Sequence, residues 1–304
     1  MSDSSVDDSH LSCGTGLSRA KLRIWPLFLV SILVGLSTIL VQLMLVVTIA
    51  VVRAAGGQVV DEGSMTALLM TAPMFVINLI TTGVCMVGGA VLFGWLSARR
   101  TQYSLADRLG VRWPCFSLFS LVGFLLGSVP VFFLSLLAVY LVGLVVPSGG
   151  SLEVLYENMT TPWAIVFIVA IGVIPGIGEE LFFRGYLQRR LIQRCGPWVA
   201  IGVTSIVFGL FHIAPQSIAL ATVIGVWLGV MAWRTNSIWP GACCHAFINS
   251  GWNIYQIGRV HWGIPDVPPL WFSIVGGVVV LVAFVASIRV FCSMKTASVD
   301  ADSL

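Results

Sequence analysis

The chain has 304 residues, of which 58% are hydrophobic and only 10% are charged, and its net charge at pH 7 is +3. Soluble globular domains carry about 25% charged residues, so this composition excludes an ordinary soluble protein. The mean hydropathy of +0.98 instead indicates an all-α, polytopic membrane protein whose main surroundings are the lipid bilayer, with no nucleic-acid partner.

The N-terminal part of the chain predicts a tail and three membrane helices. Residues 1–23 form a polar tail rich in Ser and Asp, which we expect to be disordered and cytoplasmic. The run 24–52 has no charge and far exceeds a signal-peptide core of about 7–15 residues, so it predicts a retained transmembrane helix. Two more uncharged runs predict helices at 64–98 and 117–146, and together these three helices make up the segment 24–160.

The next segment, 161–258, predicts four helices that form a catalytic core. The first begins at Thr161-Pro162-Trp163, where proline fits the first helical turn, and continues to Arg194. The charge-free run 195–233 is too long for one span. Ala214-Pro215-Gln216-Ser217 therefore predicts a turn between two helices.

The fourth helix of this core, one last helix and the loop charges complete the predicted topology. Helices are predicted at 237–255 and 269–288, the latter belonging to a last segment, 259–304, that ends in a polar cytoplasmic tail. With eight helices, every Lys and Arg except Arg53 and Arg259 falls on the N-terminal side. Loops rich in Lys and Arg usually lie on the cytoplasmic side of the membrane. We therefore predict about eight transmembrane helices in the plasma membrane, both termini cytoplasmic, and an active site inside the helix bundle.

The most informative stretch is Gly-Glu-Glu-Leu-Phe-Phe-Arg-Gly, which begins at Gly178 after a run without charge. Ionisable groups at membrane depth are costly and usually functional. Glu180 and Arg184 are four residues apart in the order that favours an ion pair. Glu179 is then the carboxylate that is not paired with the arginine.

Two histidines follow in apolar segments. Phe208 and His212 are four residues apart, as are His245 and Asn249, so each pair is predicted to share one helix face. At 1.5 Å per residue, Glu179 and both histidines reach similar depths of about 12–22 Å from the expected interface. We therefore expect the three segments to converge on one buried polar site.

These groups are suited to hydrolysis, although simpler interpretations stay open. A buried glutamate can act as general base for water, a histidine can share that work or bind a metal, and an asparagine can stabilise an oxyanion. A lone Glu–Arg pair in a membrane helix is more often a structural tie or a transporter gate. An ion- or proton-coupled transporter and a non-catalytic immunity or scaffold protein are therefore the alternative functions.

Taken together, the motifs resemble the CPBP family of intramembrane proteases, also called the Abi family, which includes the type II CAAX prenyl endopeptidases. The family pattern is Glu-Glu-x-x-x-Arg, then Phe-x-x-x-His, then His-x-x-x-Asn, and all three are complete within about 164–255. The resemblance implies an intramembrane endopeptidase in which Glu179 and His212 activate water, and His245 and Asn249 stabilise the oxyanion or complete a metal site. It assigns a supporting role to Glu180, Arg184 and Phe208.

The resemblance also bears on substrate and cofactor. It implies a membrane-bound or lipidated peptide or protein substrate, either CAAX-like or bacteriocin-like. The family is usually described as metalloproteases, although a metal-independent glutamate mechanism is also argued. The expected cofactor is therefore a divalent metal such as zinc, held by Glu179, His212 and His245, or no metal at all.

Overall fold

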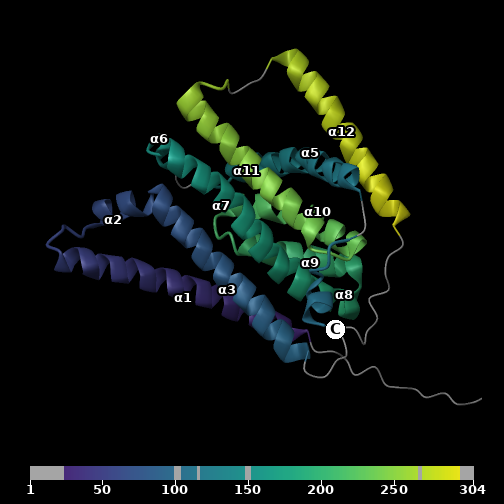
Figure 1. Cartoon of the computed structure of the whole chain (residues 1–304), viewed down its shortest axis with the longest axis horizontal. Helices are drawn as coiled ribbons and strands as arrows, with labels where there is room; N and C mark the ends of the chain where they lie inside the picture. Colours follow the sequence, from purple (N-terminus) through teal and green to yellow (C-terminus); the bar gives the residue numbers. More distant parts are fainter. Residues whose placement is uncertain (1–23, 99–103, 115–116, 148–151, 266–268, 295–304) are drawn as a thin grey trace, which may run out of the picture.

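The computed structural model describes residues 24–98, 104–114, 117–147, 152–265 and 269–294. Within these ranges the regular structure is entirely helical (Figure 1). In chain order the helices are α1 (Trp25–Ala55), α2 (Glu62–Leu69), α3 (Ala72–Ala98), α4 (Leu105–Leu109), α5 (Leu118–Gly143), α6 (Glu153–Glu157), α7 (Thr161–Glu179), the π-helix η1 (Glu180–Gln188), α8 (Arg189–Cys195), α9 (Pro197–Leu210), α10 (Pro215–Thr235), α11 (Trp239–Trp262) and α12 (Leu270–Ser293).

All eight predicted membrane segments are helical, and they differ in how well they suit a bilayer. By length and composition, six can cross a membrane, namely α1, α3, α5, the continuous α7–η1–α8 rod, α10 and α12. Helix α9 has only 14 residues, or about 21 Å, against about 30 Å of hydrocarbon. Helix α11 is long enough at 24 residues but carries several polar side chains. The prediction of an all-α polytopic membrane protein is confirmed.

Some boundaries differ from the prediction because local capping interrupts the apolar runs. The run 64–98 is not one helix. Asp61 and Ser64 form a capping box that starts α2. Helix α3 then begins afresh at Ala72, directly before Pro73, a residue that suits a first helical turn. The short helices α4 and α6 lie in segments that the sequence predicts as loops.

The α7–η1–α8 rod is the centre of the bundle, with α3 packed on one side and α11 on the other. Glycines allow both contacts to be close. A Cβ atom on Gly176 would lie 3.0 Å from the Ala242 carbonyl oxygen, and one on Gly178 would lie 3.2 Å from Gly83 Cα. Small residues at such spacing are typical of tight helix pairs in membranes. They hold the Glu-Glu-Arg segment firmly between its two neighbours.

One end of the bundle is tied together by arginines. Arg189 donates to Asp107 O at 3.1 Å and to Asn236 Oδ1 at 2.6 Å, so it joins α4, α8 and the turn between α10 and α11. Arg190 donates to Ser97 Oγ at 3.0 Å at the end of α3. These contacts define what we call the basic end of the bundle.

The side of the membrane on which the basic end lies stays a prediction. The tail 1–23 and the last residues, 295–304, lie outside the described residues. Helices α1 and α12 lie on opposite flanks of the bundle, with the α7 rod between them (Figure 1). The two flanks present different surfaces, and each is described below.

Candidate active site

The central rod changes helix type at the predicted polar motif. It is α-helical to Glu179 and π-helical from Glu180 to Gln188, and all nine residues of the π-helix are buried. Segments of π-helix are rare and often occur at functional sites. The wider turn therefore begins between the two adjacent glutamates.

A proline four residues before Glu179 leaves one backbone carbonyl in need of a donor. Pro175 lies inside α7 and has no N–H group, so the carbonyl of Ile171 lacks its usual helical partner. The Asn249 side chain on α11 supplies a donor, because its Nδ2 lies 3.2 Å from Ile171 O. The predicted Asn249 therefore holds α11 against the irregular part of α7.

A hydrogen-bonded chain connects this asparagine to a helix between the membrane spans. Tyr156 on α6 donates its hydroxyl to Asn253 Oδ1 at 2.8 Å, and Asn253 Nδ2 donates to Asn249 O at 2.8 Å. Burial raises the pKa of Tyr156 to about 12, so its hydroxyl keeps its proton and acts as a donor at physiological pH. Sequence reasoning missed Tyr156 and Asn253, although Asn253 continues the four-residue spacing of His245 and Asn249.

Glu180 is buried in the interior of the protein and makes its contacts through Oε1, whereas its Oε2 has no hydrogen-bond donor in the described chain. Arg184 Nη1 donates to Glu180 Oε1 at 2.8 Å, and both side chains are 0% exposed. Arg184 Nη2 also donates to Gly225 O at 3.2 Å, and His245 Nδ1 lies 3.2 Å from the same Glu180 Oε1. The predicted Glu180–Arg184 pair is present, and Arg184 lies inside the bundle rather than at its end.

Glu179 is placed differently from its neighbour. Its Oε2 atom is buried and makes no hydrogen bond within the described chain, and its nearest ionic partner is His245 Nε2 at 3.7 Å. The side chain keeps 13% of its surface exposed. His245 thus bridges two adjacent carboxylates, one neutralised by an arginine and one without a hydrogen-bond donor.

The prediction that His212 lies on the same helix as Phe208 is wrong, because α9 ends at Leu210 and His212 lies just beyond it. Its Nδ1 lies 3.1 Å from Phe208 O, a pure acceptor, so Nδ1 carries the proton and Nε2 is left as the basic nitrogen. The Phe208 ring contacts the His212 ring at 5.1 Å and lies under the Arg184 guanidinium at 4.4 Å. The predicted Phe208 therefore lies between His212 and the buried Glu180–Arg184 pair.

The turn after His212 is strained. Ile213 has φ of +62°, in the left-handed region, and α10 begins two residues later at Pro215. That conformation costs an ordinary residue about 1–2 kcal/mol and is least suited to a β-branched side chain. This turn explains why α9 ends before the histidine that the sequence places on it.

Glu179 and His212 line the same groove, which has a volume of about 530 Å³. His245 and Asn249 are not among its lining residues. The groove lies between α1 and the end of α9. More than half of the surface is exposed in five of its apolar residues, namely Ile32, Leu36, Ile39, Leu210 and Ile213. Its walls are formed by Phe28, Ile32, Leu36 and Ile39 on α1, Met86 on α3, and Val207, Leu210, Phe211 and Ile213 at the end of α9.

Polar side chains from α1 and α3 complete the groove. Gln42 and Thr82 line it, and Gln42 Nε2 donates to Thr82 Oγ1 at 3.0 Å and also to Asn78 Oδ1. Sequence reasoning missed this cluster. The signal available was Gln42 itself, an amide in the middle of a long uncharged run, which in a membrane helix is expected to have a polar partner.

The predicted metal ligands do not form a zinc site in this arrangement. Within the described ranges, no group of three or more His, Cys, Asp or Glu side chains is arranged to hold a metal ion. His245 and His212 each have Nδ1 engaged, by Glu180 Oε1 and by Phe208 O, which leaves Nε2 as the nitrogen that could bind a metal. A preformed zinc site usually takes three protein ligands, and the described residues are not gathered in this way, so the expected zinc ion stays a prediction.

Comparison with known proteins supports the family resemblance. Residues 161–251 match the family model described as "Rce1-like: Type II CAAX prenyl endopeptidase Rce1-like". The match covers less than a third of the chain, yet it contains every predicted site residue, whereas α1 and α3 lie outside it. No curated protein and no solved structure matches the chain.

Proposed function

We propose that this chain, whose residues 161–251 belong to the Rce1-like group of type II CAAX prenyl endopeptidases, is an intramembrane endopeptidase that uses Glu179 to activate water. The observation that carries the proposal is the difference between two adjacent carboxylates. Both carboxylates have an Oε2 atom without a hydrogen-bond donor, but Glu180 is paired with Arg184 and is 0% exposed. Glu179 keeps 13% of its side chain exposed and lines a groove with His212.

The proposed hydrolysis uses the two hydrogen-bond acceptors that line the groove, the Glu179 carboxylate and the His212 imidazole. Glu179 takes a proton from water, and the resulting hydroxide attacks the carbonyl carbon of the scissile bond. His212, whose basic Nε2 is left available, orients that water. The tetrahedral intermediate collapses as the C–N bond breaks, and the proton on Glu179 passes to the leaving amine. The products are a carboxylate and an amine, and no step requires a metal.

The remaining predicted residues act through Glu179. His245 holds the Glu179 carboxylate at 3.7 Å and is itself held by Glu180, which Arg184 neutralises. These three are positioning residues. The predicted oxyanion role of Asn249 stays a prediction, since one hydrogen of its amide is engaged by Ile171 O and the second is available.

The substrate is proposed to reach the site sideways from the bilayer. Leu36 on α1 and Ile213 beside His212 are exposed apolar side chains on either side of the groove, so the opening suits an apolar chain. A lipidated or membrane-spanning peptide, CAAX-like or bacteriocin-like, has this chemistry. An extended peptide there needs partners for its backbone groups, because the bilayer supplies none. The NH₂ group of Gln42 is engaged by Thr82 and Asn78, so its Oε1 atom is available to accept a hydrogen bond from a substrate N–H.

The experiment that tests this function uses purified protein in vesicles with fluorescence-quenched lipidated and unlipidated peptides. We expect the wild type to cleave lipidated peptides and Glu179→Ala to be inactive while still folded. Phenanthroline is expected to leave the rate unchanged, because the proposed steps use only Glu179, His212 and water.

Three results would contradict the proposal in different ways. Unchanged cleavage in both Glu179→Ala and His212→Ala would exclude the assigned site. Loss of activity with the chelator would restore the metal mechanism. Proton flux in sealed vesicles that disappears in Glu179→Gln, without peptide cleavage, would indicate the transporter alternative.

A further inference from the structure

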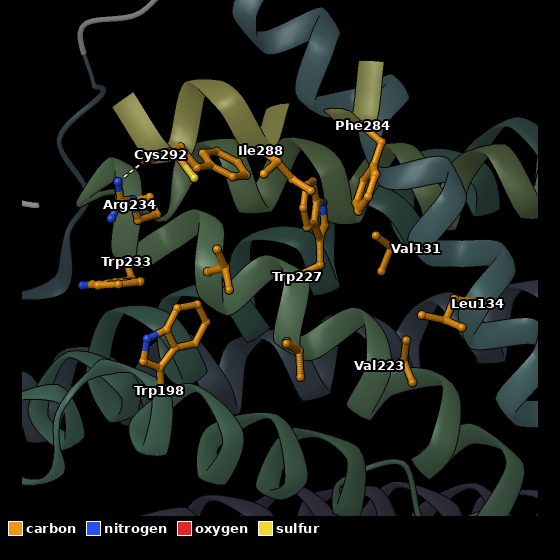
Figure 2. A pocket seen from close by; sticks show the side chains of 13 residues that line it. Val131, Leu134, Trp198, Val223, Trp227, Trp233, Arg234, Phe284, Ile288 and Cys292 are labelled. Atoms are coloured by element: carbon orange, nitrogen blue, oxygen red, sulfur yellow. Dashed lines mark hydrogen bonds between the residues drawn. The ribbon is translucent and has the colours of Figure 1, made fainter. Parts of the chain in front are cut away.

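A second large groove lies on the opposite flank of the bundle from Glu179. It has a volume of about 560 Å³ and lies between α10 and α12, with α5 contributing to one wall (Figure 2). Apart from one arginine its walls are apolar or aromatic, and they include Val131, Val223, Trp227, Phe284 and Ile288. None of these residues lines the catalytic groove.

One end of this groove carries a charge and two tryptophans. Figure 2 shows Arg234, Trp233 and Trp198 at that end, and Val223 and Leu134 at the other. The rings of Trp198 and Trp233 meet edge to face at 5.3 Å, and the Arg234 guanidinium lies 5.2 Å from the Trp233 ring centroid. An amphipathic ring pair beside a cation is typical of the level where hydrocarbon meets lipid headgroups.

Arg234 has donors to spare. Its Nη2 atom donates to the carbonyls of Phe291 and, at 2.8 Å, Met294 in the last turn of α12. Its Nε atom is buried without a hydrogen-bond partner in the described chain. Nη2 thus fixes the guanidinium on α12, and Nη1, which takes part in neither contact and is not among the buried atoms, is the donor left for an anion.

The length of the groove matches one leaflet of a bilayer. It follows α10 from Arg234 back to Val223, which is about 16 Å at 1.5 Å per residue. The hydrocarbon core is about 30 Å thick, so the groove reaches about as far as one layer of acyl chains. Its charged end is also the basic end of the bundle, because Asn236, two residues after Arg234, binds Arg189 there.

We propose that this groove binds one phospholipid from the leaflet at the basic end, with an acyl chain along α10 and the phosphate at Arg234. Arginine forms strong, directional hydrogen bonds with phosphate oxygens, and basic pockets between membrane helices bind phosphate headgroups. Helix α12 packs chiefly on α5 and makes few contacts with α10. The acyl chain fills the space between α10 and α12 and so attaches the last helix to the core.

The test measures lipid binding and thermal stability rather than peptidase activity, so it is independent of the proposed function. Purified protein in maltoside detergent is titrated with dioleoyl phosphatidylglycerol or with dioleoylglycerol, which has the same chains without phosphate. Native mass spectrometry counts bound lipid, and the melting temperature reports the coupling to α12. We expect one phosphatidylglycerol per wild-type protein, and a higher melting temperature with phosphatidylglycerol than with dioleoylglycerol.

Two variants and a matched control locate the site. Arg234→Gln is expected to weaken phosphatidylglycerol binding about tenfold or more, as for loss of a charged hydrogen bond, and to leave dioleoylglycerol unaffected. Val230→Trp, which fills the groove, is expected to abolish binding of both lipids. Val84→Trp places the same bulk on an exposed apolar position of α3 and is expected to behave as the wild type.

Three outcomes would overturn the proposal. One is equal stabilisation by the two lipids in wild type and Arg234→Gln, which would remove the role of the phosphate. Another is a Val230→Trp variant that binds lipid as well as Val84→Trp does. A third is a wild-type dimer that Val230→Trp dissociates, which would assign the groove to a second copy of the chain. If Val230→Trp does not fold, the lipid preference of Arg234→Gln decides alone.

Discussion

The core around α7 and α11 and the flanking helix α1 differ in the interactions that hold their helices in place. In the core, α7 and α11 approach through glycines and are joined by partly buried hydrogen bonds, such as that from Asn249 to Ile171. Helix α1 contributes an apolar wall with half-exposed side chains and one polar cluster around Gln42. In the proposed function, the core carries the chemistry and α1 selects what enters the groove.

The largest effect on stability is expected from breaking the buried ion pair of the core. Arg184→Met removes the partner of Glu180, whose side chain is 0% exposed. An uncompensated buried charge typically costs about 3–5 kcal/mol. Unfolding in mixed micelles should show this loss, and Arg112→Met, which alters an exposed ion pair with Asp107, is the control. Equal stability of the two variants would mean that the core is not held by its charges.

A smaller loss is expected at the proline irregularity. Asn249→Leu leaves the Ile171 carbonyl without the donor that replaces the missing N–H of Pro175. A buried unsatisfied group costs about 1–3 kcal/mol. The same unfolding assay measures it, and the double variant Asn249→Leu with Pro175→Ala should recover part of the loss because a helical N–H returns. No recovery would show that Asn249 does not act through this carbonyl.

On the α1 side the expected effect falls on substrate binding instead of stability. Gln42→Leu removes the proposed acceptor for a substrate N–H, and one hydrogen bond is worth about 0.5–1.5 kcal/mol. We therefore expect KM for a lipidated peptide to rise by about 2–10-fold with kcat nearly unchanged. Thr48→Leu, on the same helix but outside the groove, is the control. A fall in kcat at constant KM would assign Gln42 to the chemistry.

The smallest expected effect is a gain in stability at the turn between α9 and α10, which lines the groove together with α1. Ile213 has φ of +62°, a conformation that glycine adopts without penalty. Replacing Ile213 by glycine removes the conformational strain but also gives the unfolded chain more entropy, which offsets part of the gain. We expect Ile213→Gly to be more stable than the wild type by about 0.5–1 kcal/mol. Ile206→Gly, at an exposed helical position of α9, should instead lose stability. A loss at both positions would contradict the strain.

The sequence predicted most of the core because its signals are local. Long uncharged runs identify the helices, and four-residue spacings identify the Glu180–Arg184 pair and the position of Phe208 beside His212. The other features of the site depend on contacts between residues that are far apart in the sequence. The role of Asn249 depends on a carbonyl 78 residues away, and the shared groove depends on how α1 packs. The π-helix at Glu180 and the end of α9 before His212 have no periodic signature that a single sequence reveals.

Glu179 and Glu180, although adjacent, are proposed to have separate functions, and a matched pair of variants distinguishes those functions. Glu179→Gln and Glu180→Gln are compared for cleavage of a lipidated peptide and for stability in the same preparation. We expect Glu179→Gln to lose about 10²–10⁴-fold in rate, as for removal of a general base, and to stay as stable as the wild type. Glu180→Gln is expected to lose stability, because Arg184 is then buried without its counter-charge. Cleavage by Glu179→Gln at the wild-type rate, or equal destabilisation of both variants, would contradict the account.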